Sequence, residues 1–133
     1  MIYALDSNII SYFLKKDEKI RERFATETNA GNQFTISTIV YFEVERWLLE
    51  IGAIRKHMEF RRMCRDVPPE EFNLDVWNIA AELYVETRKQ GRPIDDVDLM
   101  IAAFCIANGY TLVTNNARHF DFINRLQVVN WKE

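Results

Sequence analysis

The sequence predicts an α/β protein: a three-layer α/β/α sandwich around a central, mainly parallel sheet. Short apolar or β-branched runs alternate along the chain with longer segments of helical periodicity. Such alternation is typical of parallel strands joined by crossover helices, which cover both faces of the sheet. No repeat, low-complexity tract or linker divides the chain, so residues 1–133 are expected to form a single domain.

The first half of the chain predicts two strands and four helices. The apolar residues Ile2 to Leu5 predict the first strand, and the aromatic and β-branched run Phe34 to Ile36 predicts the second. Helices are expected over residues 9–14, 19–28, 39–50 and 54–66. Asp6-Ser7-Asn8 and Ser37-Thr38 supply N-caps for the first and third of these helices. Pro68-Pro69 ends the fourth, because proline cannot continue a helix and restricts the residue before it.

The second half predicts a long amphipathic helix followed by a buried one. Phe72 to Leu74 is expected to form a short strand, and Asp75 to cap a helix over Val76 to Gln90. The segment Leu99 to Ala107 is apolar on every side, so its helix should be buried. Asn108-Gly109 predicts the end of that helix. Further strands are expected over residues 111–113 and 126–129, with a short turn or helix over residues 117–122.

Composition and charge limit the kind of protein. The 133 residues are 48% hydrophobic and 28% charged, as in an ordinary folded domain, and the net charge of −3 argues against a large basic surface. No apolar run approaches the roughly 20 residues of a membrane helix, and the first residues do not resemble a signal peptide. We therefore expect a cytoplasmic protein. Only two cysteines are present, without CxxC spacing, so neither a disulfide framework nor a zinc site is expected.

Acidic residues gather where predicted strands meet helices. Asp6 follows the first strand, Glu43 lies in the helix after the second strand, and Asp95, Asp96 and Asp98 precede the buried helix. In an open α/β sheet, ligands bind at the carboxyl ends of the strands. Carboxylates brought together there would suit Mg²⁺ or Mn²⁺, which prefer oxygen ligands.

Structural roles are open for each of these acids. Asp6 could cap a helix, and Asp95 with Asp98 could form a capping pair. Glu43 shares a helix face with apolar residues, where an unpaired carboxylate is costly, and an ion pair with Arg46 would explain it. A shared acidic pocket for a divalent cation explains Asp6 and Glu43 together.

Taken together, these motifs resemble PIN-domain ribonucleases, and most closely the VapC toxins of prokaryotic type II toxin–antitoxin systems. The resemblance covers the whole chain in the right order. The motifs that carry it are the strand ending in Asp6-Ser7-Asn8, Ile36-Ser37-Thr38 leading to Glu43, Gly91-Arg92-Pro93-Ile94-Asp95-Asp96-Val97-Asp98 with Leu99-Met100-Ile101-Ala102-Ala103, Leu112-Val113-Thr114-Asn115-Asn116-Ala117-Arg118-His119-Phe120, and Val128-Val129-Asn130-Trp131.

The resemblance implies a PIN-like fold and a metal-dependent endoribonuclease. Asp6, Glu43 and Asp98 would be the catalytic acids and metal ligands, with Asp96 as an accessory acid. One or two Mg²⁺ or Mn²⁺ ions would activate water to hydrolyse an RNA phosphodiester.

Four further residues would support these acids. Ser7 would orient Asp6, while Thr114, Asn116 and Arg118 would position water or phosphate. Many relatives carry an acid where this chain has His119, which bears on a second metal ion.

The resemblance also implies partners: an RNA substrate, a cognate antitoxin and a second copy of the chain in a homodimer. Apolar residues of the two middle helices, from Trp47 to Met63, suit the core or a groove for a partner helix. Two alternatives remain. A phosphatase using Asp6 as nucleophile would need an acid where Asn8 stands, and a non-catalytic binding module would use its acids only as caps.

Overall fold

Four parallel strands form the sheet, in the order β2-β1-β3-β4. The computed structural model describes residues 1–133. The strands are β1 (Ile2–Leu5), β2 (Gln33–Thr35), β3 (Thr111–Val113) and β4 (Val128–Val129). Tyr3 pairs with Phe34 of β2, and Ala4 pairs with Leu112 of β3. The chain adds β2 to one side of β1 and β3 to the other, so the carboxyl end of β1 lies at a topological switch point, where ligands bind in such sheets.

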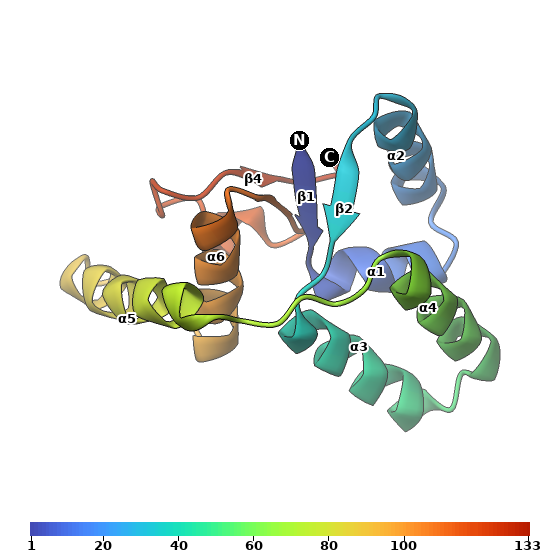
Figure 1. Cartoon of the computed structure of the whole chain (residues 1–133), viewed down its shortest axis with the longest axis horizontal. Helices are drawn as coiled ribbons and strands as arrows, with labels where there is room; N and C mark the ends of the chain where they lie inside the picture. The colour runs from blue at the N-terminus through green and yellow to red at the C-terminus, as the bar shows by residue number, and fades with distance from the viewer.

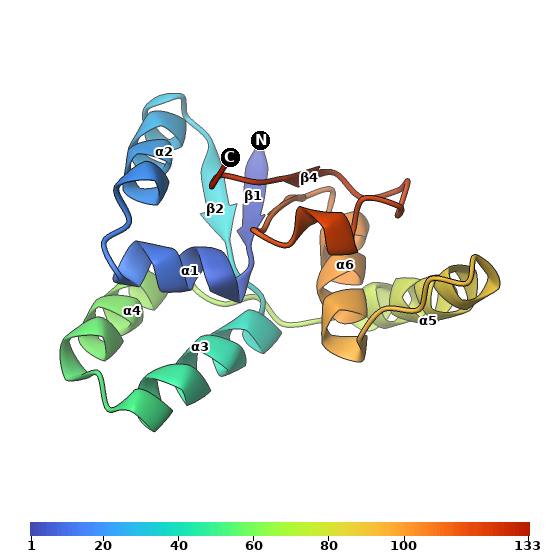
Figure 2. The same cartoon turned by 180° about the vertical axis from the view of Figure 1, so that it is seen from behind.

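Six helices flank the sheet and confirm the predicted α/β architecture. They are α1 (Ser7–Leu14), α2 (Glu18–Asn29), α3 (Thr38–Ile51), α4 (Ile54–Asp66), α5 (Leu74–Lys89) and α6 (Asp96–Asn108), and a 3₁₀ turn, η1 (Ala117–His119), follows β3. Helices α1 to α4 lie to one side of β1 and β2, and α5 with α6 lies to the other (Figures 1 and 2). No helix has the length and apolarity needed to cross a membrane.

Local sequence signals explain most helix ends. The side chains of Asp17 and Ser37 accept hydrogen bonds from backbone N–H groups three residues ahead, as N-caps do. Gly109 ends α6 with φ of 71°, a left-handed conformation that glycine adopts without steric cost. These boundaries agree with the sequence prediction.

The predicted strand over Phe72 to Leu74 is wrong. Pairing with the sheet edge occurs earlier, where Glu70 N donates to Ile36 O at 2.8 Å and Thr38 N donates to Glu70 O at 2.9 Å. The Glu70 carboxylate also accepts hydrogen bonds from the hydroxyls of Thr35 and Tyr110. The chain then turns, and Asn73 rather than Asp75 caps α5 by accepting from Val76 N.

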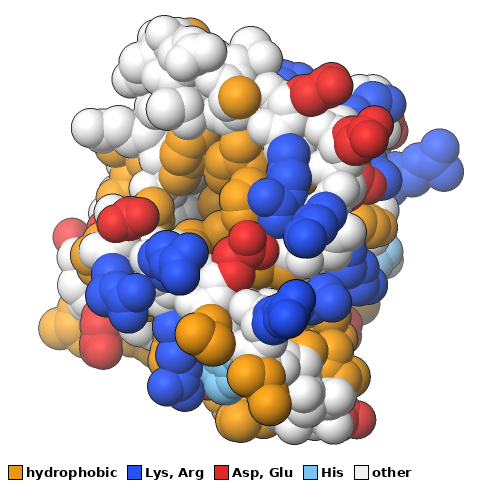
Figure 3. Space-filling view, turned by 90° about the vertical axis from the view of Figure 1, so that its right-hand side faces the viewer, with side chains coloured by type: hydrophobic (Ala, Val, Ile, Leu, Met, Phe, Trp, Pro, Cys, Tyr) orange, Lys and Arg blue, Asp and Glu red, His pale blue; other side chains and the backbone are white.

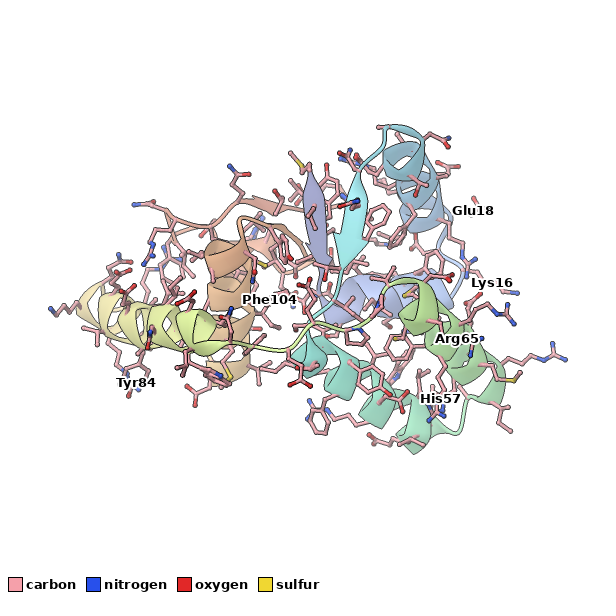
Figure 4. All side chains as sticks on the ribbon, viewed as in Figure 1. Lys16, Glu18, His57, Arg65, Tyr84 and Phe104 are labelled. Atoms are coloured by element: carbon pink, nitrogen blue, oxygen red, sulfur yellow. The ribbon has the colours of Figure 1, made fainter.

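Apolar residues from every layer form one core. The indole of Trp131 packs edge-on against Tyr3 and Phe24, which fixes the C-terminal segment on the sheet. Phe104 on α6, labelled in Figure 4, is buried and stacks on Phe72. The prediction that α6 is buried on most sides is confirmed, since six of its residues are buried.

The pair α3 and α4 is held together by polar as well as apolar contacts. His57, which lies on α4 beside α3 in Figure 4, places Nε2 at 2.8 Å from Glu45 Oε1. Both cysteines are free, Cys105 being buried in α6.

Candidate active site

Asp6 is held rigidly at the carboxyl end of β1. Its backbone N–H donates to Val113 O at 3.0 Å, so the residue continues the pairing of β1 with β3. Its carboxylate accepts from Ser7 N at 2.7 Å and from the Thr114 hydroxyl at 2.8 Å. Only 5% of Asp6 is exposed. The residue is therefore both the N-cap of α1 and a carboxylate of fixed orientation.

Thr114 connects Asp6 to the loop after β3. Its hydroxyl, fully buried, accepts from Asn8 Nδ2 at 3.2 Å and from Asn116 N at 3.1 Å. A hydroxyl has one proton and two lone pairs, so donation to Asp6 and these two acceptances use its full capacity. Asn8 Oδ1 also accepts from Asn115 N at 3.1 Å. Asn8 therefore joins the ends of β1 and β3. The sequence pattern predicted a helix cap in this segment and did not predict this bridging role.

Glu43 enters the same region from α3. Its side chain is 21% exposed, and Oε1 is buried without a hydrogen-bond partner. The predicted alternative, an ion pair with Arg46, is loose, since Arg46 Nη2 lies 3.9 Å from Glu43 Oε2 and the arginine side chain is 61% exposed. A buried carboxylate oxygen without a partner is costly, so Glu43 is poised for a cation or a donor that comes from outside the chain.

Asp98 lies in the first turn of α6, with its side chain 29% exposed. Asp95 occupies the N-cap position of that helix but makes no capping hydrogen bond with its side chain. The capping pair considered for Asp95 and Asp98 is therefore absent. His119 Nδ1 approaches Asp98 Oδ2 at 3.9 Å.

Asp6, Glu43 and Asp98 line one open cleft of about 360 Å³, together with Ser7 and Asn116. The cleft thus draws on the residue after β1, on α1, α3 and α6, and on the loop after β3. Arg118 lines an adjoining cleft. Thr114 does not line the cleft and is fully buried, so it cannot contact phosphate as expected and instead orients Asp6.

Asp96 is exposed and lines neither cleft, whereas Asp95 faces the adjoining one together with Asp98. Helical geometry explains the difference, because residues three apart share a helix face and residues two apart do not. The three-residue spacing to Asp98 could therefore have favoured Asp95 over Asp96 as the accessory acid.

Burial raises the pKa of all three carboxylates, and repulsion by Asp6 adds to this effect for Glu43 and Asp98. Burial raises the pKa of Asp6, and the hydrogen bonds from Thr114 and Ser7 oppose that rise only in part. Burial, and then the charge of Asp6, raises the pKa of both Glu43 and Asp98. Groups that burial and like charge make reluctant to ionise gain from a nearby cation.

The donor set suits Mg²⁺ or Mn²⁺. With the side chains as they stand, no three His, Cys, Asp or Glu groups lie so that they could hold a metal ion together. Mg²⁺ needs no such cage, because it keeps several waters and binds through one or two carboxylates and substrate phosphates. The unpartnered Glu43 Oε1 and the orientation of Asp6 fit such an open site.

Comparisons with known proteins match this chain over most of its length. The PIN domain profile matches residues 3–125. Ribonuclease VapC1 of Haemophilus influenzae strain R2866 is 32% identical over 138 residues, which cover 98% of each chain. The tRNA(fMet)-specific endonuclease VapC of Shigella flexneri is 28% identical, with 97% of each chain covered.

Solved structures are similar over the same length. VapBC2 from Rickettsia felis, bound to a promoter DNA fragment, matches with a TM-score of 0.89 at 28% identity and covers 98% of this chain and 99% of that one. VapBC-1 from nontypeable Haemophilus influenzae matches with a TM-score of 0.84 at 27% identity, and each chain is covered in full.

Proposed function

This chain belongs to the PIN domain family, among its VapC ribonucleases, and from that premise we propose that it is a metal-dependent endoribonuclease acting as the toxin of a type II toxin–antitoxin pair. The observation that carries the proposal is the cleft in which Asp6, Glu43 and Asp98 converge from three elements. The relatives are named as ribonucleases or endonucleases, which supports hydrolysis of RNA.

Asp6, Glu43 and Asp98 would hold Mg²⁺ or Mn²⁺. When bound, such an ion lowers the pKa of water and neutralises charge on the phosphoryl oxygens. Asp96, exposed outside the cleft, would assist only through water. This donor set is compatible with one ion or with two. A further carboxylate at position 119 would favour a second ion, and His119 does not supply that negative charge.

The supporting residues fix the geometry in which the acids act. Ser7 N and the Thr114 hydroxyl would each bond one oxygen of Asp6 and so hold its carboxylate in a single orientation at the cleft. Asn116 lines the cleft, and its side-chain amide could donate to an RNA phosphate or to water. Arg118 would contact phosphate from the adjoining cleft.

The two alternative functions have less support. A phosphatase would need an acid at the position of Asn8, whose side chain is already engaged with Thr114 and Asn115. A binding module whose acids only cap helices does not explain the unpartnered oxygen of Glu43, nor why the side chain of Asp95 makes no capping hydrogen bond.

An antitoxin has a surface suited to it. An apolar groove of about 590 Å³ runs between α2 and α4 and is lined by Phe13, Phe24, Phe34 and Met63. Figure 3 looks onto this side of the molecule, where hydrophobic side chains gather in a hollow bordered by both basic and acidic side chains. The similar structures are of VapBC pairs, which supports a protein partner, and we assign that partner to this groove.

A homodimer would cover a different face. Helix α5 exposes the apolar side chains of Leu74, Trp77, Tyr84 and Val85. Such exposed residues favour self-association through α5, which leaves the groove between α2 and α4 free for the antitoxin.

Cleavage of RNA by the purified chain tests the proposed function. We expect products in Mg²⁺ or Mn²⁺, none in EDTA, and recovery when excess metal is restored. Cleavage at an equal rate in EDTA would contradict metal dependence.

A further inference from the structure

A second cleft of about 450 Å³ adjoins the carboxylate cleft, and Asp98 lines both. Its other polar side chains are Arg92, Arg118, His119 and Asp95, and Phe122 adds an aromatic ring. Two arginines thus gather beside the acids in a chain whose net charge is negative. A ligand that reached Asp98 from this side would pass these basic groups.

Arg92 is held in place at both its backbone and its side chain. Its N–H donates to Thr87 O at 2.9 Å, and Pro93 restricts the backbone of the residue before it. The guanidinium carbon lies 4.1 Å from the centroid of the Phe122 ring, and Nη2 lies 3.8 Å from Asp121 Oδ1. Stacking fixes the guanidinium plane, while the side chain remains 54% exposed and its N–H groups can bind a ligand at little further entropic cost.

Arg118 reaches the same cleft from η1, in the loop that also carries Thr114 and Asn116. It is exposed and forms no ion pair within 4 Å, so its charge is available to a ligand. Asp95 opposes an anion here, and Asp98 would do so until a metal ion offsets its charge. The position of the arginines therefore favours binding of a phosphodiester backbone together with the metal ion.

We propose that this basic cleft binds the stretch of RNA next to the cleaved bond, with Arg92 and Arg118 each contacting a backbone phosphate. The inference rests on the proposed function, because Asp98 joins the basic cleft to the carboxylate cleft. Guanidinium groups pair with phosphate through two parallel hydrogen bonds, which suits this role. Arg92 is then a substrate-binding residue, outside the set of acids that act on the reacting bond.

RNA binding by Arg92→Gln and Arg118→Gln tests the proposal. Both changes are placed in an Asp6→Asn protein, so that RNA is not cleaved during the measurement. The probe is the shortest fluorescent single-stranded RNA that the wild type cleaves, titrated in Mg²⁺ at several salt concentrations. Each substitution should weaken binding about tenfold. Each should also reduce the slope of log K against log salt by about 0.7, the value for one phosphate contact on a single strand.

Arg88→Gln is the matched control. Arg88 also stacks on an aromatic ring, with its guanidinium carbon 4.4 Å from the centroid of Tyr84 on α5, but it lines neither cleft. Figure 4 shows Tyr84 on the outer part of α5, away from the sheet. We expect the affinity and the salt slope of this variant to match those of the Asp6→Asn parent.

Kinetics in the wild-type background separate strand binding from chemistry. Arg92→Gln should raise KM about tenfold and leave kcat within about twofold. Unchanged affinity and salt slope in both cleft variants would overturn the proposal, as would a fall in kcat at constant KM. Loss of antitoxin binding with RNA binding intact would also overturn it, because the cleft would then belong to the protein partner. If the wild type cleaves no RNA at all, the proposed function fails, and binding of a single-stranded RNA by the Asp6→Asn series still tests the cleft.

Discussion

The hydroxyl of Thr114 donates a hydrogen bond of 2.8 Å to the carboxylate of Asp6, across 108 positions of the sequence. Both residues are buried at the carboxyl ends of adjacent strands, β3 and β1. The contact therefore links the folding of the sheet directly to the orientation of the proposed metal ligand.

Replacing Thr114 with valine should impair cleavage through Asp6. The variant keeps the shape of the side chain but removes the donor to Asp6 and the acceptor for Asn8 and Asn116. Loss of such an outer partner of a metal ligand typically costs about 10–100-fold in metal affinity or activity. The measurement is the cleavage rate as a function of Mg²⁺ concentration.

Thr111→Val is the control for this variant. Thr111 is also a buried threonine of β3, but its hydroxyl faces Gln127 and not the cleft. It should cleave near the wild-type rate when corrected for the folded fraction. Equal rates for both variants would mean that Thr114 does not orient Asp6.

Stability without metal should increase as pH falls from neutral. Asp6, Glu43 and Asp98 have folded-state pKa values raised by burial, and for the latter two also by the charge of Asp6. A raised folded pKa favours the folded state below the unfolded pKa of about 4, and this contribution is lost as pH rises through the folded value. The contribution of Asp17 has the opposite sign, because the hydrogen bond from Lys132 lowers the pKa of Asp17 in the folded protein. This contribution to stability is lost only when the pH falls below the ordinary pKa of an aspartate.

Thermal unfolding in EDTA at pH 5 and pH 7.5 measures this effect. Glu43→Gln should raise the Tm at the higher pH by roughly 3–5 °C, the equivalent of about 1 kcal/mol in a chain of this size, and should reduce the stabilisation by Mg²⁺. If the Tm of the wild type in EDTA instead falls when the pH is lowered from 7.5 to 5, the carboxylates of the cleft do not destabilise the fold by burial and repulsion.

A charge placed in the apolar groove should separate antitoxin binding from catalysis. Ala25 is exposed on α2 and lines the groove, so Ala25→Glu should weaken binding of the cognate antitoxin at least about tenfold by putting a carboxylate into an apolar contact. Thr26→Glu adds the same charge at the next position, which does not line the groove. Binding isotherms with the purified antitoxin compare the two variants, and equal affinities would exclude the groove as the docking surface. RNA cleavage should be unchanged in both.

Local sequence patterns predicted the parts of the fold that depend on neighbouring residues. The strand ending at Asp6, the cap at Ser37 and the buried helix α6 all follow from such patterns and are present. The strand expected at Phe72 to Leu74 is absent because Glu70 pairs with Ile36 and Thr38, residues more than 30 positions away. That pairing sets where the chain turns, and hence which of Asn73 and Asp75, both good capping residues, begins α5.

In the site, too, local sequence patterns predict some features, whereas others depend on contacts between distant residues. Helical periodicity placed Glu43 on an inward face, and its buried Oε1 agrees with that expectation. The hydroxyl of Thr114, the amide of Asn8 and the neighbouring basic cleft depend on how β3 lies beside β1, which no local pattern specifies.

The most direct test of the account compares RNA cleavage by Asp98→Asn and Asp75→Asn. Both replace an acid in the first turn of a helix, but only Asp98 lines the carboxylate cleft. In Mg²⁺ or Mn²⁺, Asp98→Asn should lose more than about a hundredfold in rate, beyond the usual effect of an outer-sphere change, while remaining folded. Asp75→Asn should cleave within about twofold of the wild type, since its side chain is exposed on α5 and lines neither cleft. Cleavage at the wild-type rate by purified Asp98→Asn would contradict the assignment of this cleft as the active site.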